Sequence, residues 1–147
     1  MRAAATYLLG EHDFSAFQTQ GSPRKSTVRV VYDATVEKVS LSEALSFPKL
    51  DARRSRCALP LKENRGGLEP PALIAFEIEA DGFLYNMVRA IVGTLILFGQ
   101  PHRGFESPSK MKDILESADR RLAGPTAPAH GLYMIDVVYP DEIAERF

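Results

Sequence analysis

A single charged residue, Arg89, lies inside the most apolar stretch of the chain. Between Asp81 and His102 it is the only charged side chain, and residues 83–98 are otherwise almost entirely apolar. The stretch is too short to span a bilayer, and it carries Asn86 as well as Arg89. A helix that is apolar nearly all round is buried on most of its sides. The sequence therefore predicts a core helix over residues 83–98 that contains a guanidinium.

A buried guanidinium needs an acceptor close to it. It cannot lose its proton, and its burial without a partner is costly. One interpretation is an internal ion pair with Asp136, which would share a strand face with Leu132 and Met134. The other is a functional carboxylate, or a phosphate, that comes from outside the chain. Because ion pairs are often structural, residue chemistry alone favours the internal pair.

The rest of the chain predicts strands mixed with helices. Residues 28–39 and 73–80 alternate between apolar and polar side chains, and residues 132–139 are predicted to form a final strand. Residues 2–9 and about 107–117 predict two further helices. One-sided strands with interspersed helices favour an α+β fold, with a mixed, largely antiparallel sheet and helices on one face. A length of 147 residues fits one domain.

Two finer predictions concern the first strand and the segment before it. Residues 10–26 are predicted to be a loop, because they are polar and are broken by Gly21 and Pro23. Within residues 28–39 the alternation predicts that one face carries Val28, Val30, Tyr32, Ala34 and Val36.

Charge and cysteine content exclude some classes of protein. Eighteen basic and nineteen acidic residues give a net charge of −1, so the chain lacks the bulk positive field of many nucleic-acid binders. Any basic patch must be local, and residues 40–72 are predicted to form a long basic loop or insertion. The single cysteine, Cys57, and three scattered histidines show no metal-ligand spacing. We therefore expect no metal site.

Three motifs, in order along the chain, carry a family resemblance. GEHDFSAF spans residues 10–17, DGFLYNMVRAIVGTL spans residues 81–95, and AGPTAPAHGLY spans residues 123–133. Together they resemble the C-terminal half of the tRNA pseudouridine synthase A family. The resemblance implies the α+β pseudouridine synthase fold. It also implies a homodimeric, cytoplasmic enzyme that isomerises uridines of the tRNA anticodon stem-loop without cofactor or metal. The target base is flipped out of its stack to be reached.

The resemblance also supplies an anion for Arg89. In the family an Arg at this place in the signature pairs with a catalytic Asp, which sits in an Arg-x-Asp-x-Gly segment of the N-terminal half. None of the eight Asp residues of this chain has that context. We therefore expect residues 1–147 to be a C-terminal domain whose N-terminal lobe, with the catalytic Asp, is absent. Such a chain is expected to be inactive alone and to need a complementing N-terminal lobe as partner.

The expected site residues follow from the same motifs. Arg89 is the expected catalytic residue, as partner of the missing Asp. Gly131 and Leu132 lie in the closing segment that borders the family's active-site cleft, and Tyr85 and Asn86 lie beside Arg89 in the signature. These four residues are the expected substrate-pocket residues.

Basic residues outside the motifs are candidates for contacts with tRNA phosphates. A solvated basic loop is the alternative interpretation. At the level of the whole chain two alternatives stay open: a non-catalytic RNA- or protein-binding α+β module, and a structural domain in which Arg89 pairs with Asp136. The candidate RNA-binding residues are Arg24, Lys25, Arg53, Arg54 and Arg56.

Overall fold

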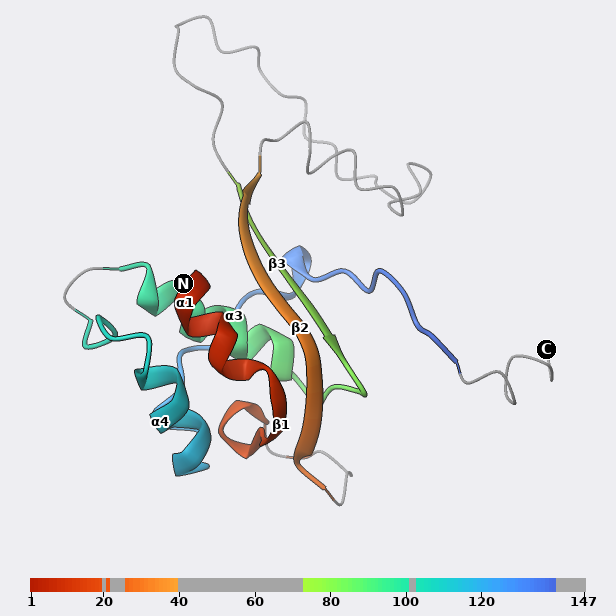
Figure 1. Cartoon of the computed structure of the whole chain (residues 1–147), viewed down its shortest axis with the longest axis horizontal. Helices are drawn as coiled ribbons and strands as arrows, with labels where there is room; N and C mark the ends of the chain where they lie inside the picture. The colour runs from red at the N-terminus through yellow and green to blue at the C-terminus, as the bar shows by residue number, and fades with distance from the viewer. Residues whose placement is uncertain (20, 22–25, 40–72, 101–102, 140–147) are drawn as a thin grey trace, which may run out of the picture.

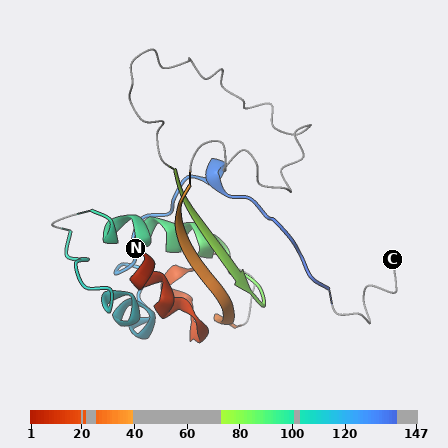
Figure 2. The ribbon, with the colours of Figure 1, turned by 45° about the horizontal axis from the view of Figure 1, so that its top comes forward.

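The computed structural model describes residues 1–19, 21, 26–39, 73–100 and 103–139. The sheet has three antiparallel strands in the order β1-β2-β3. The helices α1, α3 and α4 lie together on one side of it (Figures 1 and 2). This confirms the α+β prediction. The elements are α1 (Arg2–Ala5), η1 (Thr6–Leu8), β1 (Gly10–Asp13), η2 (Ser15–Phe17), β2 (Val28–Val39), β3 (Leu73–Ala80), α3 (Met87–Phe98), α4 (Lys110–Ser117) and η3 (Ala129–Gly131).

The core fills the space between the helices and the sheet. An apolar stripe of α4, formed by Met111, Ile114 and Leu115, is buried. Burial of this stripe removes apolar surface from water and gives the short helix most of its stability. Its neighbours in the core come from the other helical elements and from β2: Ala4, Leu8, Phe14, Phe17, Val31, Ala34, Val36, Met87, Ile91 and Leu95.

The strand β2 does not keep one buried face along its length. Ala34 and Val36 are buried as predicted, but Val30 and Tyr32 are not, and Val31 is buried instead. The register against β3 shifts between Val31 and Asp33, so β2 has one residue more than β3 at this point. An extra residue of this kind is a β-bulge, and it reverses the inward and outward alternation. The face predicted for residues 28–32 is therefore wrong.

Three element boundaries also differ from the sequence predictions. The core helix begins at Met87 rather than at residue 83, because Asn86 takes the left-handed conformation with φ 61° and interrupts the helical path. Residues 10–13 form β1, where a loop was predicted, because they pair with β2. Residues 132–139 lie outside the sheet, where a strand was predicted. No helix in the part of the chain that the structure describes is long and apolar enough to cross a membrane.

Candidate functional site around Arg89

Neutral oxygens hold the Arg89 guanidinium. Its Nε donates to the carbonyl oxygen of Ala127 at 2.7 Å, and its Nη1 donates to Asn86 Oδ1 at 2.9 Å. The backbone carbonyl of Arg89 in turn accepts from the Ala127 amide at 3.0 Å. Arg89 and Ala127 thus clasp each other through two hydrogen bonds of opposite direction.

No carboxylate lies within ion-pair distance of Arg89 among the described residues. The internal pair with Asp136 is therefore not formed there, and Asp136 Oδ1 accepts from the Val137 amide at 2.9 Å. In the same part of the chain, no hydrogen bond involves Nη2 of Arg89. The side chain is half-buried. A guanidinium fixed by neutral acceptors keeps its full charge and a free N–H edge for a carboxylate or a phosphate.

Asn86 sets the orientation of Arg89 from the start of α3. Its Oδ1 accepts from Arg89, while its Nδ2 donates to Thr19 Oγ1 at 3.2 Å. The Thr19 amide donates to the carbonyl of Tyr85 at 3.2 Å, which ties the segment after η2 to the same turn. Asparagine is one of the few residues that tolerate the left-handed conformation found here. The Tyr85 side chain is 60% exposed.

Residues 123–127, which we call the strap, run along α3 in close contact with it. The Gly124 amide donates to the buried Thr94 Oγ1 at 2.8 Å, and that hydroxyl donates to the Ala90 carbonyl at 2.8 Å. A Cβ on Gly93 would lie 1.6 Å from the Pro125 carbonyl oxygen. Glycine is thus required in α3 for the backbones to approach so closely. The strap carries the Ala127 carbonyl that fixes Arg89.

Arg120 also holds the strap, and no role was predicted for it from the sequence. Its Nη1 donates to the Gly124 carbonyl at 2.8 Å, and its Nη2 donates to Thr126 Oγ1 at 3.2 Å. The only signal in the sequence is its position just before a Gly- and Pro-rich segment, and many basic residues share such a position. Only its hydrogen bonds to the strap distinguish Arg120 from those residues.

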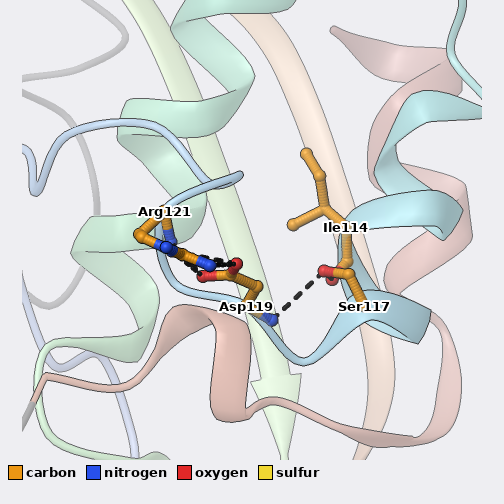
Figure 3. A network of polar contacts seen from close by, with 4 residues as sticks. All are labelled: Ile114, Ser117, Asp119 and Arg121. Carbon is orange, nitrogen blue, oxygen red and sulfur yellow. Dashed lines mark hydrogen bonds and ion pairs between the residues drawn. The ribbon is translucent and has the colours of Figure 1, made fainter.

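The next residue, Arg121, has an unrelated role. Its Nη2 forms an ion pair with Asp119 Oδ2 at 2.7 Å on the surface (Figure 3). The hydrogen bond from Arg121 lowers the pKa of Asp119 to about 2. The Asp119 amide donates to Ser117 Oγ, and that hydroxyl donates to the Ile114 carbonyl, which closes the end of α4 (Figure 3). None of these contacts reaches the strap.

The remaining predicted site residues are placed as follows. Gly131 ends η3, the Leu132 amide donates to the Ala129 carbonyl at 3.0 Å, and the Leu132 side chain is 48% exposed. The structure thus brings Arg89 and Asn86 together, while the side chains of Tyr85 and Leu132 stand exposed. The candidate RNA-binding residues, Arg24, Lys25, Arg53, Arg54 and Arg56, lie outside the described residues.

A hollow of about 300 Å³ lies elsewhere, between β1 and the end of α4. Glu11, His12, Asp13 and Glu116 line it, and none of them belongs to the Arg89 network. The His12 ring forms a hydrogen bond with the Leu9 carbonyl, with 2.8 Å between Nε2 and the oxygen. Within the described part of the chain, no group of three or more His, Cys, Asp or Glu side chains could hold a metal ion.

Comparisons with known proteins identify relatives of this chain. A family model described as "tRNA pseudouridine synthase" matches residues 4–140. The chain is 43% identical over 139 residues to "tRNA pseudouridine synthase A" of Thermoanaerobacter sp. (strain X514), and this match covers 95% of the chain and 43% of the relative. A protein of the same name from Acetivibrio thermocellus is 39% identical, with the same coverage of both chains.

A more distant relative has the same relation to the chain. The protein of that name from Bdellovibrio bacteriovorus is 34% identical over 146 residues, which are 99% of the chain and 43% of the relative. The chain thus spans less than half the length of these curated relatives. Since the family model matches almost the whole chain, the chain belongs to the tRNA pseudouridine synthase family.

Proposed function

We propose that the chain is the C-terminal part of a tRNA pseudouridine synthase and that it supplies Arg89 to a site whose catalytic aspartate comes from a separate N-terminal lobe. In this reaction the uracil base is detached from its ribose and rejoined through carbon. The substrate is a uridine of the tRNA anticodon stem-loop. No metal or cofactor takes part. The whole enzyme acts as a homodimer.

The observation that carries this proposal is the state of Arg89. Its guanidinium is held by Ala127 and Asn86, and no described carboxylate neutralises it. Two hydrogen bonds to neutral acceptors orient the side chain without neutralising its charge, so an incoming aspartate meets a preorganised partner. A purely structural arginine would be expected to end on a carboxylate of its own chain.

The proposed pocket residues differ in how directly they contact Arg89. Asn86 acts directly on Arg89 and is proposed to set its direction. Tyr85, Gly131 and Leu132 are exposed, and they are proposed to line the base pocket once the N-terminal lobe covers them. An apolar side chain such as Leu132 favours a flipped base because the base keeps a dry, stacked environment.

The test uses a fused protein in which the part of the Thermoanaerobacter relative that this chain does not match is joined to the chain in the relative's own order. The isolated chain, incubated with unmodified tRNA, should form no pseudouridine above a control without enzyme, and the fused protein should form it. In the fused protein Arg89→Met should lower kcat by about 100-fold, because a charged hydrogen bond of about 3 kcal/mol is lost.

Two variants make the result specific. Arg89→Lys should not restore activity, because an ammonium cannot reproduce the forked geometry of a guanidinium. Arg121→Met removes an exposed arginine that pairs with Asp119 away from the Arg89 network, and it should leave activity unchanged. Pseudouridine formation by the isolated chain, or full activity of the folded Arg89→Met protein, would contradict the proposal. Binding of tRNA without any turnover by the fused protein would favour a non-catalytic RNA-binding module.

The basic residues are proposed to bind tRNA phosphates. If Arg53, Arg54 and Arg56 each contact one phosphate, their joint replacement by Gln should weaken tRNA binding. The slope of log K against log salt should become shallower by about 3, since each phosphate contact contributes roughly 0.9. An unchanged slope would show that these residues are a solvated loop.

A further inference from the structure

The strap lies on α3 without forming a helix or a strand. Because residues 123–127 have no regular secondary structure, their contacts with other residues decide where each of their carbonyl groups points. This direction matters most at Ala127, whose carbonyl oxygen accepts from Arg89 Nε at 2.7 Å. A contact that fixes the Ala127 carbonyl therefore also fixes the direction of the Arg89 guanidinium.

Hydrogen bonds to α3 hold the strap at two points. The Gly124 amide donates to a buried hydroxyl of α3 at 2.8 Å, and the Ala127 amide donates to a carbonyl of α3 at 3.0 Å. Between these points lie Pro125, which has no N–H to donate, and Thr126. In the described structure no backbone–backbone hydrogen bond involves either of these two residues. The backbone hydrogen bonds alone therefore leave the middle of the strap unfixed.

Arg120 fixes this middle part from both sides of the proline. Its Nη1 donates to the Gly124 carbonyl at 2.8 Å, and its Nη2 donates to Thr126 Oγ1 at 3.2 Å. The two nitrogens belong to one planar, rigid group, and Pro125 restricts its own φ angle. The position of residue 126 relative to residue 124 is thereby set, and with it the direction in which the chain enters Ala127.

The charge of Arg120 is not neutralised by an ion pair. The side chain is half-buried, and among the described residues no carboxylate lies within ion-pair distance of it. Its third acceptor is also a neutral oxygen, the Ala123 carbonyl at 3.5 Å. Arg121, in contrast, is 89% exposed and pairs with Asp119. A guanidinium that binds only neutral acceptors contributes its forked geometry.

We propose that Arg120 is a positioning residue for pseudouridine formation, because through the strap it holds the Ala127 carbonyl where that carbonyl directs Arg89 toward the catalytic aspartate. The inference rests on the proposed function in one respect, namely that this aspartate meets Arg89. Arg120 acts on the reaction only through Arg89. A small displacement of a catalytic group lowers the rate even when its cause is distant from the chemistry, by as much as about 100-fold.

The experiment measures two quantities in Arg120→Met: pseudouridine formation by the fused protein, and the Nε–H resonance of Arg89 in the isolated chain. We expect kcat to fall by about 10-fold and KM for tRNA to stay within about twofold, because a residue that only directs Arg89 contributes to the transition state and not to tRNA binding. The Arg89 resonance should move toward its position in an unstructured peptide.

A second variant keeps the proposal testable if Arg120→Met does not fold. Thr126→Val removes one of the two acceptors that the guanidinium joins and leaves the other in place. It should lower kcat by about threefold and move the Arg89 resonance in the same direction by a smaller amount. Unchanged values of both quantities in this variant would contradict the proposal.

Three control variants separate positioning from charge and from stability. Arg120→Lys keeps the charge, but an ammonium cannot reproduce the fork to Gly124 and Thr126, so it should not restore kcat. Arg121→Met removes the adjacent arginine and should change neither quantity. Ile114→Val removes a methylene group from the core and lowers stability, but it should also change neither quantity in the folded protein.

Each other outcome contradicts the proposal. An unchanged Arg89 resonance in folded Arg120→Met overturns it, and so does an unchanged kcat in the fused protein. Full activity of Arg120→Lys would show that charge matters rather than geometry. A raised KM with a shallower salt dependence would identify Arg120 as a contact to a tRNA phosphate. Equal effects of Ile114→Val would show that Arg120 only stabilises the fold.

Failure of this inference can be told apart from failure of the proposed function. If the unaltered fused protein forms no pseudouridine, the proposed function is contradicted, and the Arg89 resonance in the isolated chain then decides the inference alone. If the unaltered fused protein is active and Arg120→Met changes neither quantity, only the inference is overturned.

Discussion

The strap (residues 123–127) and residues 132–139, the exposed segment, are neighbours in the chain, but only the strap is held against the rest of the described structure. The strap has few large apolar side chains, yet hydrogen bonds from Arg120, Arg89 and Thr94 hold it against α3. The exposed segment is among the most apolar parts of the chain, yet it packs against none of the described core. Apolar composition therefore shows that a segment needs cover, whereas a complementary surface decides whether the cover is present.

A similar contrast separates Arg120 from Arg121. The first donates to the Gly124 carbonyl and to the Thr126 hydroxyl of the strap, and the second forms a local ion pair with Asp119. The two side chains have the same chemistry and adjacent positions, so only their surroundings differ. Arg121 is therefore a matched control for the test of Arg120.

The largest effect is expected where the strap touches α3 most closely. Gly93→Ala should lower the free energy of unfolding by about 3 kcal/mol, because the new methyl group would overlap the Pro125 carbonyl and backbone would have to move. Chemical denaturation of the isolated chain measures this. Gly131→Ala is the control, because a Cβ there meets nothing within 4 Å. Equal stability of the two variants would show that the strap is not packed on α3.

A smaller effect is expected at the arginine that supports the strap. Arg120→Met keeps the aliphatic part of the side chain but removes the donors to Gly124 and Thr126, which should cost about 2 kcal/mol of unfolding free energy. The Nε–H resonance of Arg89 should shift as well, because the Ala127 carbonyl moves with the strap. Arg121→Met should change neither quantity. If the Arg89 resonance stays in place in Arg120→Met, the strap and Arg89 are not coupled.

The hydroxyl of Thr94 should contribute less. Thr94→Val leaves the Gly124 amide without its buried acceptor and should lower the free energy of unfolding by about 1 kcal/mol. Faster hydrogen exchange of the Gly124 amide reports the same loss locally. Thr6→Val removes an exposed hydroxyl that donates to the Ala3 carbonyl, and it should have no measurable effect. A stable, fully protected Thr94→Val protein would contradict this assignment.

The smallest effect is a titration that does not involve the strap. The hydrogen bond from Arg121 lowers the folded-state pKa of Asp119 to about 2, from 3.8. A lowered pKa means that any stabilisation is present above pH 3.8 and is lost as the pH falls through 2. A carboxyl-carbon NMR titration should give a midpoint near 2 in the unaltered chain and a higher midpoint in Arg121→Met, in which only the backbone amide of residue 121 still donates to the carboxylate. Since Arg121 is exposed and Asp119 is only partly buried, the free energy of unfolding at neutral pH should not change measurably. A change in it would show that this pair is coupled to the strap.

Part of the site could be predicted from the sequence. Arg89 is conspicuous because its neighbours are apolar, and the motifs around it carry the family resemblance that the comparisons confirm. The roles of Arg120, Thr94 and Gly93 could not be predicted, because each depends on a segment that is distant in the chain or follows no periodic pattern. The internal Arg89–Asp136 pair was plausible from strand faces, but residues 132–139 do not form a strand in the described sheet.

The sequence by itself determined the elements whose patterns are local. The apolar stripe of α4 and most of β2, β3 and α3 follow from side-chain periodicity, which depends on residues within one or two turns or strand steps of each other. Only the tertiary structure decided the pairing of β1, the bulge in β2, and the clasp between Arg89 and the strap. The physical reason is that a backbone hydrogen bond or a close backbone contact joins residues by their position in space, and neither leaves a repeating mark along the chain.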